Sequence, residues 1–129
     1  MSAVPESHRD LLEINSNMML ATNGADGYPQ VTLVSFLFED DLFKVSLGSG
    51  RQKLKNMVRD SRVTIFFLDP NNAYRTLEIR ADATVEPDPD FTFADRLGAK
   101  YATNLRDWSP PGESRFVVSF APNKVNTYG

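Results

Sequence analysis

The sequence of 129 residues contains no cysteine and one histidine, His8. The absence of cysteine excludes disulfide bonds, zinc–thiolate sites and thiol nucleophiles. One histidine does not provide the spaced ligands of a metal site. His8 lacks the context of a nucleophilic serine or cysteine, and we expect it to be exposed on an N-terminal helix. Neither hydrolytic chemistry nor metal binding is therefore indicated.

The sequence also lacks long apolar runs. None approaches the ~20 residues of a membrane span, and the N-terminal MSAVPESHRDLLEI lacks the apolar core of a secretory signal. We therefore expect a cytoplasmic protein without a membrane span. No repeat, low-complexity segment or linker is visible, which predicts one domain over residues 1–129. The net charge of −3 weighs against a general nucleic-acid binder.

Alternating apolar residues and β-branched segments predict a mainly β protein with six or seven strands. The expected strands are 18–22, 30–38, 42–47, 62–68, 74–85 and 115–120, with a short last one at 125–128. Helical periodicity predicts helices at 5–17, 49–59 and 88–101. Tight turns between consecutive strands favour antiparallel pairing. A β-barrel with flanking helices would pair most of the strand edges.

Basic residues are concentrated in the segment 48–62, GSGRQKLKNMVRDSR, of an otherwise acidic protein. Its cations are Arg51, Lys53, Lys55, Arg59 and Arg62, opposed by Asp60 alone. The segment begins at a glycine-containing turn before a predicted helix, and the unpaired N–H groups of a helix start favour anions.

Spacing along this helix favours a phosphate site. Arg51 and Lys55 lie four residues apart, and Lys53 and Asn56 three apart, so each pair shares a helix face. The alternative is a solvated basic face, with Arg59 and Arg62 in local ion pairs to Asp60. A phosphate site combined with few catalytic side chains suggests that a cofactor carries the reaction.

Aromatic residues are candidates for the walls of a ring-binding pocket. They are Trp108, Tyr101, Phe36 and Phe38. The alternative role for these side chains, especially Phe36 and Phe38, is packing in the core.

The segment MLATNGADGYPQVTLVSF, followed by Arg51, Lys53 and Asn56 in the pattern R-x-K-x-x-N, resembles the pyridoxamine 5′-phosphate oxidase-like split β-barrel family. The resemblance extends over residues 8–128. It implies a split β-barrel homodimer with two cofactor sites in clefts between the subunits. Members bind FMN or the deazaflavin coenzyme F420, and some relatives bind heme. The short chain and the R-x-K-x-x-N pattern are most similar to the deazaflavin-using branch common in actinobacteria.

The resemblance also implies roles for individual residues. Arg51 and Lys53 would hold the cofactor phosphate, with Lys55 and Asn56 nearby. The strand 31–36 would lie along the ring system and position it through backbone groups. The cofactor-binding residues expected on or beside this strand are Gln30, Val34, Ser35 and Phe36. Arg80 departs from the family pattern, in which a glycine is more usual, so close cofactor approach at that point is in question.

The function expected first is hydride transfer between reduced coenzyme F420 and a small unsaturated organic substrate, with Trp108 and Tyr101 in the substrate pocket. Three alternatives remain open. These are an FMN-dependent oxidase or reductase, a non-catalytic carrier of a flavin-like cofactor, and a small anion-binding or nucleic-acid-binding module. Histidine-liganded heme is disfavoured because His8 is the only candidate ligand.

Overall fold

The structure is a computed structural model, which is described here for residues 3–129. Its seven strands form one antiparallel sheet in the order β2-β1-β5-β6-β7-β4-β3. The strands are β1 (Asn17–Asn23), β2 (Pro29–Ser35), β3 (Leu37–Glu39), β4 (Leu42–Gly48), β5 (Arg62–Asp69), β6 (Asn72–Pro87) and β7 (Arg115–Tyr128). The helices are α1 (Leu11–Ile14), α2 (Gln52–Arg59) and α3 (Thr92–Lys100), with short 3₁₀ turns η1 (Glu6–His8) and η2 (Leu105–Trp108). The predicted mainly β, antiparallel architecture is confirmed.

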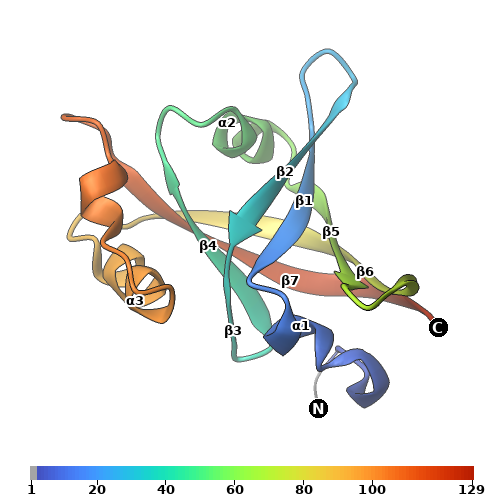
Figure 1. Ribbon diagram of the computed structural model, residues 1–129. Helices are drawn as coiled ribbons and strands as arrows, with labels where there is room; N and C mark the ends of the chain where they lie inside the picture. The colour runs from blue at the N-terminus through green and yellow to red at the C-terminus, as the bar shows by residue number, and fades with distance from the viewer. Residues whose placement is uncertain (1–2) are drawn as a thin grey trace.

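The sheet curls so that its two edge strands, β2 and β3, are consecutive in the chain and joined through Phe36. Figure 1 shows α2 across one end of this split barrel and α1 at the opposite end, with α3 beside β4. No helix within residues 3–129 has the length and apolar character needed to cross a membrane.

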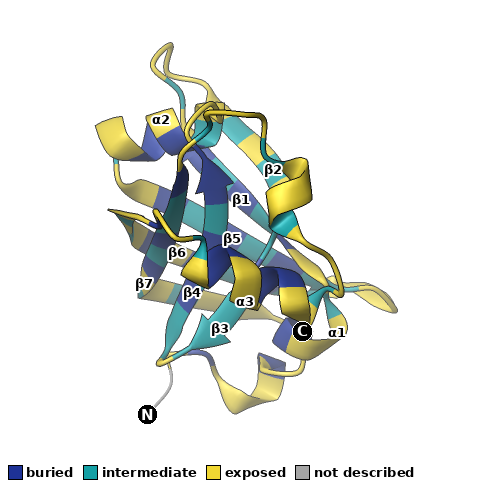
Figure 2. Cartoon of the chain, turned by 90° about the vertical axis from the view of Figure 1, so that its left-hand side faces the viewer, coloured by how far each residue is buried: buried dark blue, intermediate teal, exposed yellow. Residues whose placement is uncertain are grey.

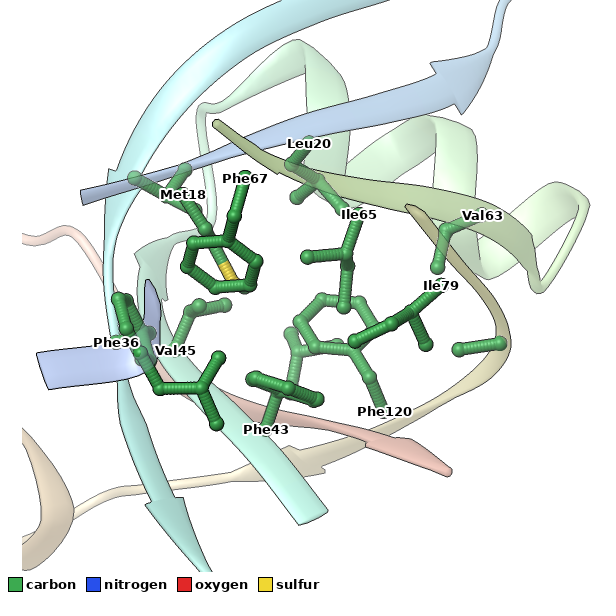
Figure 3. Packing of buried hydrophobic residues seen from close by; sticks show 14 of the residues in the cluster. Met18, Leu20, Phe36, Phe43, Val45, Val63, Ile65, Phe67, Ile79 and Phe120 are labelled. Carbon is green, nitrogen blue, oxygen red and sulfur yellow. The ribbon is translucent and has the colours of Figure 1, made fainter. Parts of the chain in front are cut away.

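The core fills the inside of the curled sheet. Phe36, Phe43 and Phe67 are each at most 1% exposed, and their ring centroids lie 5.4–6.1 Å apart. These rings point toward one another with aliphatic side chains from β1, β5 and β6 around them (Figure 3). Buried residues follow the strands, whereas turns and the outer sides of helices are exposed (Figure 2). The alternation expected from the sequence places these residues inside.

The N-terminal segment differs from the predicted helix 5–17. It folds as η1 and α1, and the Asn15 side chain ends α1 by donating to Leu11 O (2.8 Å) and Leu68 O (3.0 Å). The expectation that His8 is exposed was wrong, because His8, at the end of η1, is only 5% exposed. Its Nε2 lies 3.1 Å from Tyr128 O at the end of β7.

Two strand boundaries also differ from the prediction. The expected strand 30–38 ends at Ser35 and resumes as β3, because Phe36 turns its ring into the core at the corner between them. The segments 115–120 and 125–128, expected as two strands, form the single 14-residue β7. A register shift between Arg80 and Ala81 accommodates Pro122, which pairs with Ala81. Proline is tolerated at such bulges.

Helix α3 begins at Thr92, four residues later than the predicted helix 88–101, and its N-cap residue is Phe91. Asp88, the predicted cap, acts from three residues before that position. The buried Asp88 carboxylate accepts hydrogen bonds from the backbone N–H groups of Phe93 (3.2 Å) and Ala94 (3.0 Å). The first turn of α3 is thereby fixed beside the start of β7, where Asp88 N also donates to Arg115 O (2.9 Å).

Acid is expected to weaken the attachment of α3 to β3. Glu39 accepts hydrogen bonds from Arg96 (2.8 and 3.0 Å) and Lys44 (3.2 Å), which lower the pKa of Glu39 to about 2. Because the folded-state pKa is depressed, this stabilisation is complete above the ordinary pKa of 4.5 and is lost as the pH falls toward 2. Glu39→Gln should lower the stability at pH 7 by less than about 1 kcal/mol, since the ion pairs are partly exposed. Urea unfolding at pH 7 and pH 2.5 measures this, and an equal loss at both values would contradict it.

Candidate functional site

The basic residues predicted to bind phosphate are positioned by the start of α2. Arg51 is the N-cap residue in an extended conformation, so the helix begins at Gln52, three residues later than predicted. Leu54 and Met57 anchor the helix in the core. Val58, which occupies a position of the predicted apolar stripe, is 70% exposed.

Arg51 and Lys53 line a cavity of about 400 Å³ between β2, β4 and the α3–η2 region, which we call the cationic pocket. Its third cation is Arg115, at the start of β7. The other lining residues are apolar or uncharged: Leu33, Val34, Ser35, Ser46, Leu47, Leu97, Thr103, Leu105 and Trp108. The pocket therefore combines three positive charges with a largely apolar wall, and no carboxylate lines it.

Two of these cations are partly removed from water. Lys53 Nζ donates to Thr32 Oγ1 on β2 (2.9 Å), and burial together with the charge of Arg51 lowers the pKa of Lys53. Burial also lowers the pKa of Arg115, and the positive charge of Arg51 lowers it further. The negative charges of Glu113 and Asp88 act in the opposite direction. Arg51 thus repels both Lys53 and Arg115, and an anionic ligand would relieve this repulsion.

The three cations of the pocket have no carboxylate partners among residues 3–129, a property they share with Arg9, Lys55, Arg59, Lys100 and Lys124. Among residues 3–129, six basic side chains form ion pairs with carboxylates: Lys44, Arg62, Arg75, Arg80, Arg96 and Arg106. None of the three cations of the pocket takes part in such a pair. A solvated basic face, the alternative considered for this helix, does not explain why Lys53 is partly buried without a counter-ion. Arg115, on β7, is buried without one as well.

The turn before α2 brings a carboxylate close to the backbone. A Cβ placed on Gly48 would lie 1.6 Å from Glu113 Oε1, so a larger residue there would displace the end of the Glu113 side chain. Ser49 N donates to Ser114 O (2.8 Å), which joins the two loops above the pocket. Gly48 thus lets the Glu113 carboxylate pack against the backbone of this turn.

Asn56 and Gln30 lie outside the cationic pocket that Lys53 lines. The buried Asn56 amide donates to Thr22 Oγ1 (3.0 Å) and Gln30 Oε1 (3.3 Å) and accepts from Gln52 Nε2 (2.9 Å). With Gly24 and Tyr28, the residues Gln30, Gln52 and Asn56 line a separate cavity near the β1–β2 turn. Lys55 is exposed and lines none of the cavities described here. The structure therefore brings Arg51, Lys53, Val34 and Ser35 together, but not Lys55, Asn56 or Gln30.

The aromatic candidates are also divided. Trp108 lines the cationic pocket, is 70% exposed and donates from Nε1 to Thr103 Oγ1 (3.1 Å). Tyr101 lies in another cavity, where its hydroxyl contacts the backbone N and O of the core residue Phe36 and Ser16 O. Phe36 is 1% exposed and packs in the core. Tyr101 therefore fixes the corner between β2 and β3, beside the pocket-lining part of β2.

Among the three cations of the pocket, Arg115 is the one that the sequence did not indicate. In the sequence, Arg115 has no basic neighbour and lies between a loop and an apolar strand. The pairing of Gly48 with Arg115 brings it to the start of α2. Arg80, at the position where the family resemblance predicts glycine, is exposed on β6 and lies 3.5 Å from Glu78 Oε1. It lines a shallow cavity with Arg62 and Asp82, separate from the cationic pocket.

Comparison with known proteins supports the resemblance. The solved structure of an F420 reductase superposes with a TM-score of 0.82 at 31% identity, covering 95% of this chain and 98% of that one. The heme storage protein HutZ from Vibrio cholerae has a TM-score of 0.76 at 19% identity, covering 100% and 96% of the two chains. A Clostridium acetobutylicum protein related to general stress protein 26 has a TM-score of 0.69 at 16% identity, with coverages of 97% and 90%. The last two likenesses concern the fold alone.

Among curated proteins, none matches this sequence significantly. The family model described as pyridoxamine 5′-phosphate oxidase matches residues 4–129. This match covers nearly the whole chain, and the 31% identical F420 reductase agrees with it. The chain therefore belongs to the pyridoxamine 5′-phosphate oxidase family of split β-barrel proteins.

Proposed function

We propose that the protein is an oxidoreductase that uses coenzyme F420, bound in the cationic pocket, to reduce a small unsaturated organic substrate. The observation that carries this proposal is the set of three cations without ion-pair partners, Arg51, Lys53 and Arg115, beside an apolar wall. Such a pocket suits a ligand with an anionic end and a flat apolar body. The 31% identical F420 reductase supports the choice of cofactor.

The chain itself would bind and orient the cofactor. Arg51 and Lys53 would hold its phosphate through charge-assisted hydrogen bonds. The ring would lie along β2, an edge strand whose outer backbone groups are not paired with another strand. Leu97, Leu105 and Trp108 would cover the ring and exclude water. When bound, the deazaflavin supplies the hydride, and the protein lowers the barrier by orientation.

FMN is the second candidate cofactor. The matching family model is that of pyridoxamine 5′-phosphate oxidase, and FMN would place a phosphate and a tricyclic ring on the same residues. Fluorescence titrations with FMN and with coenzyme F420 distinguish the two. Tighter binding of coenzyme F420 supports the proposal, tighter binding of FMN favours the alternative, and binding of neither ligand would overturn both. Turnover with an acceptor separates an enzyme from a cofactor carrier.

We also propose that a second copy of the chain covers β2. Tyr28, Val31 and Leu33 are 75%, 61% and 66% exposed on or beside this edge strand, and Val58 on α2 is 70% exposed. Exposed apolar clusters of this kind mark interaction surfaces, and a dimer would close the pocket against water.

Val31→Lys should therefore convert a dimer to a monomer, because it would place a charge in the apolar contact. Light scattering coupled to size-exclusion chromatography measures the mass in solution. Ile14→Lys, at the opposite end of the barrel (Figure 1), is the matched control and should leave the mass unchanged. A monomeric wild type, or a dimeric Val31→Lys variant, would refute the proposed interface.

A further inference from the structure

Arg115 is a mostly buried cation with an unused hydrogen-bonding edge. The residue is 8% exposed. Its Nε donates to Ser109 Oγ (3.0 Å), and its Nη1 donates to Ser46 Oγ (3.3 Å) and Ser46 O (3.5 Å). All three acceptors are uncharged. Within residues 3–129, Nη2 donates to no atom, and no fully buried side-chain nitrogen or oxygen lacks a partner. Nη2 is therefore accessible.

The free Nη2 belongs to a residue that lines the cationic pocket. The two carboxylates whose charges reach Arg115 are occupied elsewhere. Asp88 caps α3, and Glu113 packs over Gly48. Neither forms an ion pair with the guanidinium among the described residues. A guanidinium that is held in place at two nitrogens, and whose third nitrogen has no protein acceptor, is prepared to bind an anion.

The surrounding structure holds this guanidinium in position. Ser109 Oγ, which accepts from Arg115 Nε, donates to Leu105 O in η2 (3.2 Å). Ser46 lies on β4, whose pairing with β7 continues to Gly48 and Arg115. The Arg115 side chain thus connects Ser109, which follows η2, with Ser46 on β4. Arg115 itself lies on β7, whereas Arg51 and Lys53 lie at the start of α2.

We propose that Arg115 binds a second anionic group, distinct from the phosphate assigned to Arg51 and Lys53, so that the pocket takes ligands with at least two anionic groups. This inference rests on the proposed function, which assigns the cofactor phosphate to Arg51 and Lys53 at the start of α2. The second group comes either from the cofactor beyond its first phosphate or from a carboxylate on the substrate. The shared chemistry is an oxyanion that accepts from Nη2.

Calorimetric titration of the wild type with orthophosphate and with pyrophosphate tests the second subsite. Arg115→Gln should weaken pyrophosphate binding by about tenfold, the loss expected for one charge-assisted contact, and leave orthophosphate binding within about twofold. Arg115→Lys should retain most of the affinity for pyrophosphate, because it keeps the charge. Thermal unfolding of both variants verifies that they are folded.

Each outcome bears on a defined claim. Orthophosphate binding that falls as far as pyrophosphate binding in Arg115→Gln would mean that all three cations share one anion, and would overturn the second subsite. Unchanged pyrophosphate binding would also overturn it. Absence of orthophosphate binding to the wild type would instead refute the phosphate site of the proposed function.

A second arm identifies the source of the anion. If the cofactor supplies it, Arg115→Gln should weaken coenzyme F420 binding in the absence of substrate. If the substrate supplies it, cofactor affinity should be unchanged, and KM should rise for acceptors that carry a carboxylate but not for their esters. Unchanged cofactor affinity together with an unchanged KM for both acceptors would refute the inference.

Discussion

Replacing Arg51 and Lys53 together with alanine is expected to lower cofactor affinity by about a hundredfold or more. Charge-assisted hydrogen bonds contribute about 1.5–3 kcal/mol each, and about 1.4 kcal/mol corresponds to a tenfold change in affinity. The two side chains line one pocket and have no carboxylate partner among residues 3–129, so their loss leaves no carboxylate unpaired. Fluorescence titration with coenzyme F420 and with FMN measures the effect.

The control removes one positive charge from outside the pocket. Lys124 is exposed on β7 and does not line the cationic pocket, so Lys124→Ala should bind the cofactor as the wild type does. The affinity of the double variant should also depend less on salt concentration, because fewer positive charges attract the anionic cofactor. Equal losses in the double variant and in Lys124→Ala would show that only the overall charge matters.

Phe43→Ala is expected to cause the largest loss of stability, about 4 kcal/mol. Phe43 is 0% exposed and lies among three other rings, with centroid distances of 4.6 Å to Phe38, 5.9 Å to Phe67 and 6.1 Å to Phe36. Those rings come from β3, from β5 and from the corner between β2 and β3, so they cannot all close the cavity. Calorimetry should show a Tm lower by roughly 15 °C, at about 4 °C per kcal/mol for a chain of this length.

Phe43→Leu keeps much of the volume and is the matched comparison. We expect it to lose roughly a third of what the alanine variant loses, because the remaining cavity is smaller. Similar losses in the two variants would indicate that ring-to-ring geometry, and not cavity size, stabilises this part of the core. A loss below about 1 kcal/mol for Phe43→Ala would show that the core repacks easily.

The strands were predictable because apolar and polar residues alternate along most of them. In β4, the residues Phe43, Val45 and Leu47 are all buried, as their spacing predicts. The break at Phe36 was not predictable, because QVTLVSFLF is a continuous β-forming sequence. What interrupts it is the turn of Phe36 into the core and the contacts of its backbone with Tyr101, 65 residues away.

Two of the three cations of the candidate site were visible in the sequence. Arg51 and Lys53 are close in the sequence and follow a glycine-containing turn, so their proximity does not depend on contacts between distant segments. Arg115 was missed because its role depends on β4–β7 pairing, which joins Gly48 to a residue 67 positions later. His8 was misjudged for a similar reason, since its partner Tyr128 lies at the other end of the chain.

The position of β7 in the sheet has a consequence for the order of folding. Strand β7 is the last in the chain, yet it lies between β6 and β4 and provides the only pairing of the β3–β4 hairpin with the rest of the sheet within residues 3–129. The sheet cannot be completed on the ribosome before β7 has emerged, and until then β4 has an open edge. Folding dominated by such distant contacts is slow. A chain cut before Arg115 would leave the β3–β4 hairpin exposed and prone to aggregation.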